Sequence, residues 1–284
     1  MKKVFSYSLF EPKVLPQHRF WDTKKNDKNR YWYNIPTISI VNEALFPEYE
    51  NIFYVSKNIW NNPVSEVFDI CSNIECRTID KDYDLTEPAI WRMMPLWNLD
   101  VDILCTRDLD SLPSIEEYYF LKEFEKSDCL VGTLRSHENH YGLSCRMLAG
   151  LSSFKANKIP FEIKGPNYYF YEVNKLDRYG SDQELLIRTF TTNEEFTKNY
   201  FLDCKIHKQK NSQDFACNNF SIKEYEIENQ KQEIFDLIKN KTNSEWLGQP
   251  CDSRGELLKE ILKMNSEIKE KIINNKFLKE FYKV

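Results

Sequence analysis

Apolar and polar positions along the first part of the chain form blocks that favour strands and helices in turn. Residues 2–9 and 51–55 have the short apolar runs of strands, and a further short strand is expected at 78–79. Residues 36–45 and 64–71 have the spacing of amphipathic helices. Pro36 suits a first helical turn, so we expect that helix to begin there. This β-α-β-α alternation predicts a mostly parallel sheet flanked by helices.

Residues 91–111 combine a helix-like segment, a buried strand and an acidic end. The spacing from Trp91 to Trp97 is amphipathic, and Val101–Cys105 is apolar enough for a strand buried on both faces. Asp108 and Asp110 then follow where a parallel sheet binds ligands, at the carboxyl end of a strand. Two aspartates separated by one residue can reach one hard divalent cation, but such pairs are also common in solvated turns.

The second part of the chain continues the alternation and then changes in composition. After Thr192 it becomes rich in Lys, Asn and Glu. We predict one α/β domain over residues 1–212 and a helical appendage over 213–284 that packs on it. The further elements expected are helices at 115–126, 184–190, 226–239 and 256–283, and strands at 129–133 and 201–206.

Composition favours a soluble, cytoplasmic protein. The 284 residues are 41% hydrophobic and 29% charged, the mean hydropathy is -0.61, and no apolar run approaches the roughly 18 residues of a membrane span. A net charge of -5 gives no reason to expect a nucleic acid partner. The eight cysteines contain no Cys-x-x-Cys pair, which favours a reducing compartment. The basic faces of the C-terminal helices leave two interpretations open, solvated surface or a peripheral membrane contact.

The stretch 91–111 resembles the core of nucleotide-sugar glycosyltransferases of the GT-A fold, with their Asp-x-Asp motif. Residues 130–156 resemble the acceptor-side strand, histidine-bearing loop and small-residue turn of bacterial and viral members. Residues 179–186 resemble the Asp-Gln motif of the glycogenin-like branch, and residues 201–208 resemble the late strand that ends in a metal-binding histidine. The resemblance covers residues 1–210 and implies a GT-A-like, Rossmann-type mixed sheet.

The resemblance also implies a metal and nucleotide site. Asp108, Asp110 and His207 would hold Mn²⁺ or Mg²⁺ against the diphosphate of the donor. An exposed histidine at a strand end is the competing interpretation of His207, and a solvated turn is that of the two aspartates. Tyr7 is a candidate for stacking on the base, against the alternative of a core tyrosine.

Two arginines beside the predicted strand are further candidates for the nucleotide site. Arg92 is expected to pair with a phosphate or with Asp108, unless it is a surface residue. Arg107 has the same ambiguity, and strand alternation points it away from the face that Asp108 takes.

The remaining candidates belong to the sugar and acceptor side. Arg135 and His137 form part of a polar cluster too small for structural zinc, and we interpret them as substrate-facing. Gly150 would let the backbone pass close to the donor sugar, or it serves an ordinary tight turn. The resemblance assigns Asp182 and Gln183 to the donor sugar and reaction centre, although Ser181 or Asp182 is also a suitable helix N-cap.

These patterns predict a metal-dependent glycosyltransferase that moves a sugar from a nucleotide-diphosphate sugar to the hydroxyl of a glycan or other acceptor, as in surface polysaccharide synthesis. If the reaction inverts, Asp182 is the candidate base; if it retains, no such base is required. The alternatives are a metal-dependent phosphohydrolase or nucleotidyltransferase that uses the same carboxylates, or a non-enzymatic scaffold in which the Asp-x-Asp pair is a turn.

Overall fold

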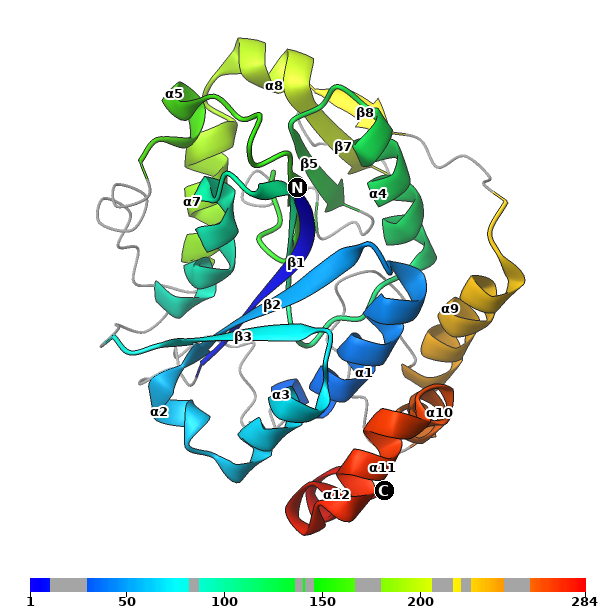
Figure 1. Cartoon of the computed structure of the whole chain (residues 1–284). Coiled ribbons are helices and arrows are strands. Elements are labelled where there is room, and N and C mark those ends of the chain that lie inside the picture. The colour runs from blue at the N-terminus through cyan, green and yellow to red at the C-terminus, as the bar shows by residue number, and fades with distance from the viewer. Residues whose placement is uncertain are drawn as a thin grey trace.

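The strands form the centre of the structure, with helices on both sides (Figure 1). The computed structural model describes residues 1–10, 30–81, 87–135, 140, 146–166, 180–205, 217–220, 226–242 and 256–284. Within these residues the sheet has eight strands in the order β3-β2-β1-β4-β6-β5-β7-β8. Their bounds are β1 Lys2–Leu9, β2 Tyr49–Ser56, β3 Ile74–Ile79, β4 Val101–Arg107, β5 Val131–Arg135, β6 Leu151–Phe154, β7 Phe201–Lys205 and β8 Asn218–Phe220.

The sheet confirms the predicted fold class, a mostly parallel α/β sheet flanked by helices. β1 pairs in parallel with β2 and β4, and β7 pairs in parallel with β5 and β8. β6 alone among the described strands runs antiparallel to its neighbours, β4 and β5. It therefore begins at the edge of the sheet where β4 ends.

The central strand β4 is buried on both faces, as its apolar run predicts. Leu104 and Cys105 point to opposite faces and neither is exposed to solvent. The strand continues two residues beyond the apolar run, to Arg107. The polar end of β4 is thus part of the same strand that crosses the core.

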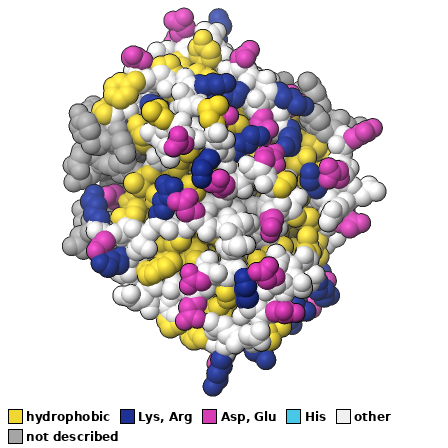
Figure 2. All heavy atoms as spheres, viewed as in Figure 1, with side chains coloured by type: hydrophobic (Ala, Val, Ile, Leu, Met, Phe, Trp, Pro, Cys, Tyr) yellow, Lys and Arg dark blue, Asp and Glu magenta, His cyan; other side chains and the backbone are white. Residues whose placement is uncertain are grey.

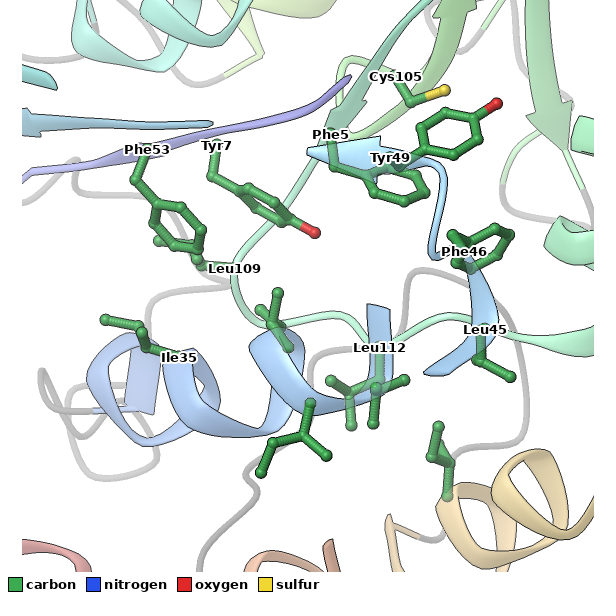
Figure 3. Close-up of a cluster of buried hydrophobic side chains, with 14 of the residues drawn as sticks. Phe5, Tyr7, Ile35, Leu45, Phe46, Tyr49, Phe53, Cys105, Leu109 and Leu112 are labelled. Atoms are coloured by element: carbon green, nitrogen blue, oxygen red, sulfur yellow. The ribbon is translucent and has the colours of Figure 1, made fainter. Parts of the chain in front are cut away.

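Each face of the sheet has its own apolar core. The first includes Phe5 and Tyr7 of β1, which stack on Tyr49 and Phe53 with ring centroids 4.6 Å apart in both pairs (Figure 3). The second includes Val4 and Leu104. Besides the helices after residue 228, those that contribute to the first core are α1 (Arg30–Leu45), α2 (Lys57–Trp60), η1 (Pro63–Glu66), α3 (Val67–Ile70) and α4 (Ile115–Lys126). Those that contribute to the second core are η2 (Glu87–Trp97), α5 (Phe161–Lys164), α7 (Ser181–Phe190) and α8 (Glu194–Tyr200).

Helix α1 begins six residues earlier than the sequence pattern predicts, so Pro36 lies inside the helix. Proline has no N–H, and within an α-helix it leaves the carbonyl four residues earlier without its usual donor. That carbonyl belongs to Trp32, and the Tyr282 hydroxyl donates to it over 2.9 Å. Tyr282 is 1% exposed, so a buried side chain from the C-terminal end of the chain replaces the missing donor.

The C-terminal helices are α9 (Asn229–Thr242), α10 (Glu256–Met264), α11 (Ser266–Asn274) and α12 (Lys276–Tyr282). The expected helix over 256–283 is divided in three because Asn265 and Asn275 each accept hydrogen bonds from backbone N–H groups of the helix that follows. α9 and α10 pack on α1, α11 packs on α3 and α12 packs on η1. β8 adds to the sheet beyond residue 212, and the division of the chain at that residue stays a prediction.

The apolar stripe of these helices faces the domain. Leu257, Ile261, Ile268 and Leu278 belong to the core of the first face. On the side of the molecule seen in Figure 2, basic and acidic side chains are interspersed. No helix in the described part of the chain is both long and apolar enough to cross a membrane, and the peripheral contact stays a prediction.

Candidate functional site

The candidate site lies at the carboxyl ends of β1 and β4. The strand order reverses between these two strands, because β2 and β3 extend the sheet from β1 while β6 and β5 extend it from β4. Such a switch point is where open α/β sheets bind ligands. Asp108 follows β4, Ser8 lies near the end of β1, and Gly150 comes directly before β6.

Arg92 of η2 joins the two acidic segments of this edge. One of its terminal nitrogens, Nη1, donates to the Asp108 carboxylate and to the Arg107 carbonyl, the latter over 3.0 Å. The other, Nη2, donates to Asp182 Oδ2 over 2.6 Å. Its backbone N–H donates to the Ser8 hydroxyl over 3.0 Å. Segments far apart in the sequence are therefore tied together by one guanidinium.

The Arg92 side chain is 8% exposed, whereas the Asp108 side chain is 45% exposed. Burial acts to lower the pKa of Arg92, but attraction to Asp108 and Asp182 outweighs it and holds the pKa above its usual value. The guanidinium is consequently a fixed positive charge at this edge. The sequence left Arg92 either as a partner of a phosphate or of Asp108, or as a surface residue. The structure contains the pair with Asp108.

Gly150 approaches the Asp108 carboxylate, which explains the need for glycine here by space alone. A Cβ at residue 150 would lie 2.0 Å from Asp108 Oδ2 and 2.4 Å from its Cγ. The close approach in the structure is to Asp108, and an approach to the donor sugar stays a prediction.

The loop after β4 is fixed by hydrogen bonds to its backbone. The Ser111 N–H and hydroxyl both donate to the Asp108 carbonyl, over 3.3 and 3.2 Å. Asn34 of α1 donates to the Leu109 carbonyl over 2.9 Å. Asp110 lies inside this loop with 9% of its surface exposed.

Asp182 lies in the first turn of α7 and does not cap it. The N-cap position belongs to Gly180, which has a φ of 81°, so the predicted capping role of Ser181 or Asp182 is wrong. The two carboxylate oxygens of Asp182 accept from Arg92 and from the Gln183 backbone N–H, the latter over 2.8 Å. Asp182 therefore does reach the edge where Asp108 lies, and the role of Gln183 stays a prediction.

Arg107 turns to the first face of the sheet, as strand alternation predicts. It forms a buried ion pair with Glu117 of α4, and its guanidinium carbon lies 5.1 Å from the centre of the Phe5 ring. Attraction to Glu117 raises the pKa of Arg107 although burial opposes it. Because its charge is already matched inside the core, a contact with phosphate would require the pair to break.

Arg135 is likewise held inside the structure. It pairs with Asp203 of β7 through two hydrogen bonds, one from Nε over 2.8 Å, and the two side chains are 5% and 1% exposed. A substrate-facing role is not what this arrangement provides.

Tyr7 belongs to the core. It is 3% exposed, its ring stacks on Phe53, and its hydroxyl accepts from Asn42 over 2.9 Å. Stacking on a nucleotide base would require the ring to leave this cluster, so the core interpretation fits the structure.

A divalent cation fits Asp108 and Asp110 in the kind of donor, because both offer oxygen only. His137 and His207 lie outside the described residues, and His207 stays a predicted ligand. The described ranges contain no cluster of three or more His, Cys, Asp or Glu side chains placed to hold a metal.

Sequence reasoning missed two partners, Glu117 and Asp203. Ser114-x-x-Glu117 has the spacing of a capping box, and the Ser114 hydroxyl does accept from the Glu117 N–H, but the Glu117 carboxylate pairs with Arg107 instead. Its spacing alone gave no sign of a buried ion pair. Asp203 interrupts an otherwise apolar strand beside β5, and this was the available signal that it neutralises a basic partner.

No protein-family model matches the chain, and no curated protein sequence matches it. Among solved structures it is similar to a "putative nucleotide-diphospho-sugar transferase" from Desulfovibrio desulfuricans G20, with 11% identity, a TM-score of 0.41, and coverage of 95% of this chain and 98% of that one. It is also similar to 4-diphosphocytidyl-2C-methyl-D-erythritol synthase from Anaerococcus prevotii DSM 20548, with 13% identity, a TM-score of 0.35, and coverage of 65% and 83%. Both likenesses are too distant to decide an activity.

Proposed function

We propose that the chain transfers a sugar from a nucleoside-diphosphate sugar to an acceptor hydroxyl, with a divalent cation held by Asp108 and Asp110. The observation that carries the proposal is the meeting of Arg92, Asp108 and Asp182 at the switch point of the sheet. A half-exposed carboxylate beside a buried cation at such an edge is suited to a ligand that carries both charge and metal.

In the proposed reaction some residues of the chain would stabilise negative charge, and others would position the groups that do so. When bound, Mn²⁺ or Mg²⁺ would stabilise the negative charge that develops on the leaving diphosphate. Arg92 supplies a guanidinium whose planar fork matches phosphate oxygens. Gly150 leaves the space in which the Asp108 carboxylate lies.

Asp182 is better suited to holding Arg92 than to removing a proton. One of its oxygens accepts from the guanidinium and the other from a backbone N–H. An acceptor hydroxyl would have to share one of these oxygens with a donor that is already in place. This favours a reaction without a carboxylate base at residue 182, and the anomeric configuration of the product, determined by NMR, tests it.

Thermal unfolding with a panel of UDP, GDP, CDP and their sugars, each with and without Mn²⁺ or Mg²⁺, tests the proposal. We expect a nucleotide to raise the melting temperature only when the metal is present. At a free ligand concentration about 100 times the Kd, binding adds roughly 2.7 kcal/mol of stability, which a melt resolves. Equal shifts with and without metal would argue against a bridging ion.

Two asparagine variants make the test specific. Asp108→Asn should abolish both the metal-dependent shift and transfer, because it removes one carboxylate from a hard cation. Asp69→Asn is the matched control, since Asp69 is exposed on α3 at the other face of the sheet. A free nucleoside diphosphate as product indicates transfer, whereas pyrophosphate or inorganic phosphate would identify a nucleotidyltransferase or phosphohydrolase.

A further inference from the structure

We infer that Arg92 and a divalent cation compete for Asp108. In the free protein the Arg92 guanidinium therefore occupies the place beside Asp108 where the metal would bind. This inference rests on the proposed function, because it concerns the same carboxylate. It adds a coupling between metal and nucleotide that the proposed function does not require.

Arg92 is fixed from several sides, by the Asp108 carboxylate, by Asp182, and by the Ser8 hydroxyl at its backbone N–H. Its Nε is buried and has no hydrogen-bond partner among the described residues. The side chain thus enters the site as an anchored group, and its contact with Asp108 is the one that reaches the exposed side.

Each oxygen of the Asp108 carboxylate has a close neighbour. Asp108 Oδ1 is engaged by Arg92, and Oδ2 lies where a Cβ on Gly150 would be. While Asp108 keeps this position, Oδ1 faces the guanidinium and Oδ2 faces Gly150. A metal that binds Asp108 must therefore bind beside the guanidinium and against its charge, or displace it.

Arg92, Asp108 and Asp182 together carry a net charge of -1, one positive group against two negative ones. Without Arg92 the two carboxylates would present a charge of -2 and attract a cation more strongly. A diphosphate changes this balance, because its oxygens can accept the guanidinium in place of Asp108 and leave that carboxylate to the metal. Metal and nucleotide should then strengthen each other's binding by the same factor.

The experiment is a calorimetric titration of the folded full chain with Mn²⁺ alone. In Arg92→Gln we expect tighter Mn²⁺ binding than in the unmodified protein, by about tenfold if a unit charge and a divalent ion repel across roughly 6 Å of water-like medium. Arg188→Gln is the matched control, because Arg188 is an exposed arginine of α7 whose removal changes the net charge equally. It should leave Mn²⁺ affinity within about twofold, since exposed charges beyond a Debye length are screened.

Two further variants keep the test decisive. Arg92→Lys retains a charge that can reach only one carboxylate at a time, so its Mn²⁺ affinity should fall between those of the unmodified protein and Arg92→Gln, and it serves alone if Arg92→Gln does not fold. In the Asp108→Asn background, Arg92→Gln should no longer tighten binding. A merely structural arginine would not raise metal affinity when it is removed.

Repeating the titration with the nucleoside diphosphate that gives the largest melting shift separates the two proposals. We expect the nucleotide to tighten Mn²⁺ binding in the unmodified protein and much less in Arg92→Gln. If Mn²⁺ binds with nucleotide but Arg92→Gln binds Mn²⁺ equally or more weakly, the competition is refuted while the proposed function stands. If neither protein binds Mn²⁺ with or without nucleotide, the proposed function itself fails.

Discussion

The two residues at the end of β4, Arg107 and Asp108, are adjacent in sequence and have opposite surroundings. Arg107 turns into the first face of the sheet and pairs with Glu117, and those side chains are 7% and 2% exposed. Asp108 pairs with Arg92 but keeps 45% of its side chain exposed. The first pair is enclosed within the core, whereas the second leaves a carboxylate open to a ligand. An ion pair at a strand end thus indicates a binding site only when one partner remains accessible.

The buried pair should show the largest effect on stability. Removing one partner of a buried ion pair leaves the other charge uncompensated, and we expect Arg107→Met to lower the free energy of unfolding by about 3–5 kcal/mol. Urea denaturation followed by circular dichroism measures it. The double variant Arg107→Met/Glu117→Met should recover most of the loss, because no charge is left unpaired. If the double variant is as unstable as the single one, packing of Arg107 on Phe5 matters more than its charge.

Some features of the end of β4 were predictable from the sequence and others were not. A run of apolar residues between charges specifies a doubly buried strand, because only such a strand covers both of its faces. Alternation then assigns Arg107 and Asp108 to opposite sides. Arg92 was among the expected partners of Asp108, and the structure contains this pair. Glu117 was not predictable as the partner of Arg107, because it comes from a helix whose position depends on packing over the whole sheet.

A second enclosed contact is the one between Tyr282 and the carbonyl of Trp32. Tyr282→Phe removes the donor and leaves a buried carbonyl unsatisfied, at an expected cost of about 1–3 kcal/mol. Pro36→Ala supplies an N–H at the position that should bond the same carbonyl. In that background the cost of Tyr282→Phe should fall, and chemical denaturation of the four proteins in the cycle measures the coupling. An unchanged cost would mean that the hydroxyl contributes through another contact.

This contact also explains an error in the predicted helix boundary. Pro36 favours a first turn when only local sequence is considered, so the helix was expected to begin there. The structure extends the helix to Arg30, because the Tyr282 side chain, 250 residues after Trp32, satisfies the carbonyl that proline leaves open. A local rule cannot include a donor that arrives from the other end of the chain.

At the open site, Gly150→Ala should have a smaller effect on stability and a large one on binding. The new Cβ would displace the Asp108 carboxylate, and we expect a cost near 1 kcal/mol because that side chain can move into solvent. The metal-dependent melting shift should be lost. In the Asp108→Ala background the atoms that the Cβ would meet are absent, so Gly150→Ala should become nearly neutral. A full cost in that background would assign the need for glycine to the turn rather than to Asp108.

The sequence predicted which residues meet at the candidate site better than it predicted what each of them does. Asp108, Gly150 and Asp182 meet at one edge of the sheet, because each stands near the end of a strand or helix that the alternation brings there. Arg92 reaches them from the middle of η2. Arg135 was assigned to substrate because it belongs to a polar, histidine-bearing cluster too small for structural zinc. Its actual partner lies on β7, the neighbouring strand, and cross-strand register is not readable from a single strand.

The smallest effect is expected for the exposed pair on α7, between Arg188 and Glu184. It joins an arginine to a carboxylate as the Arg107 pair does, but its side chains are 56% and 25% exposed and lie one helical turn apart. Water screens the attraction and ordering two long side chains opposes it, so Arg188→Gln should cost only about 0.3–0.5 kcal/mol. Urea denaturation at low and high salt measures this, and added salt should reduce the difference further. If Arg188→Gln cost as much as Arg107→Met, burial would not be what separates the enclosed pairs from the open ones.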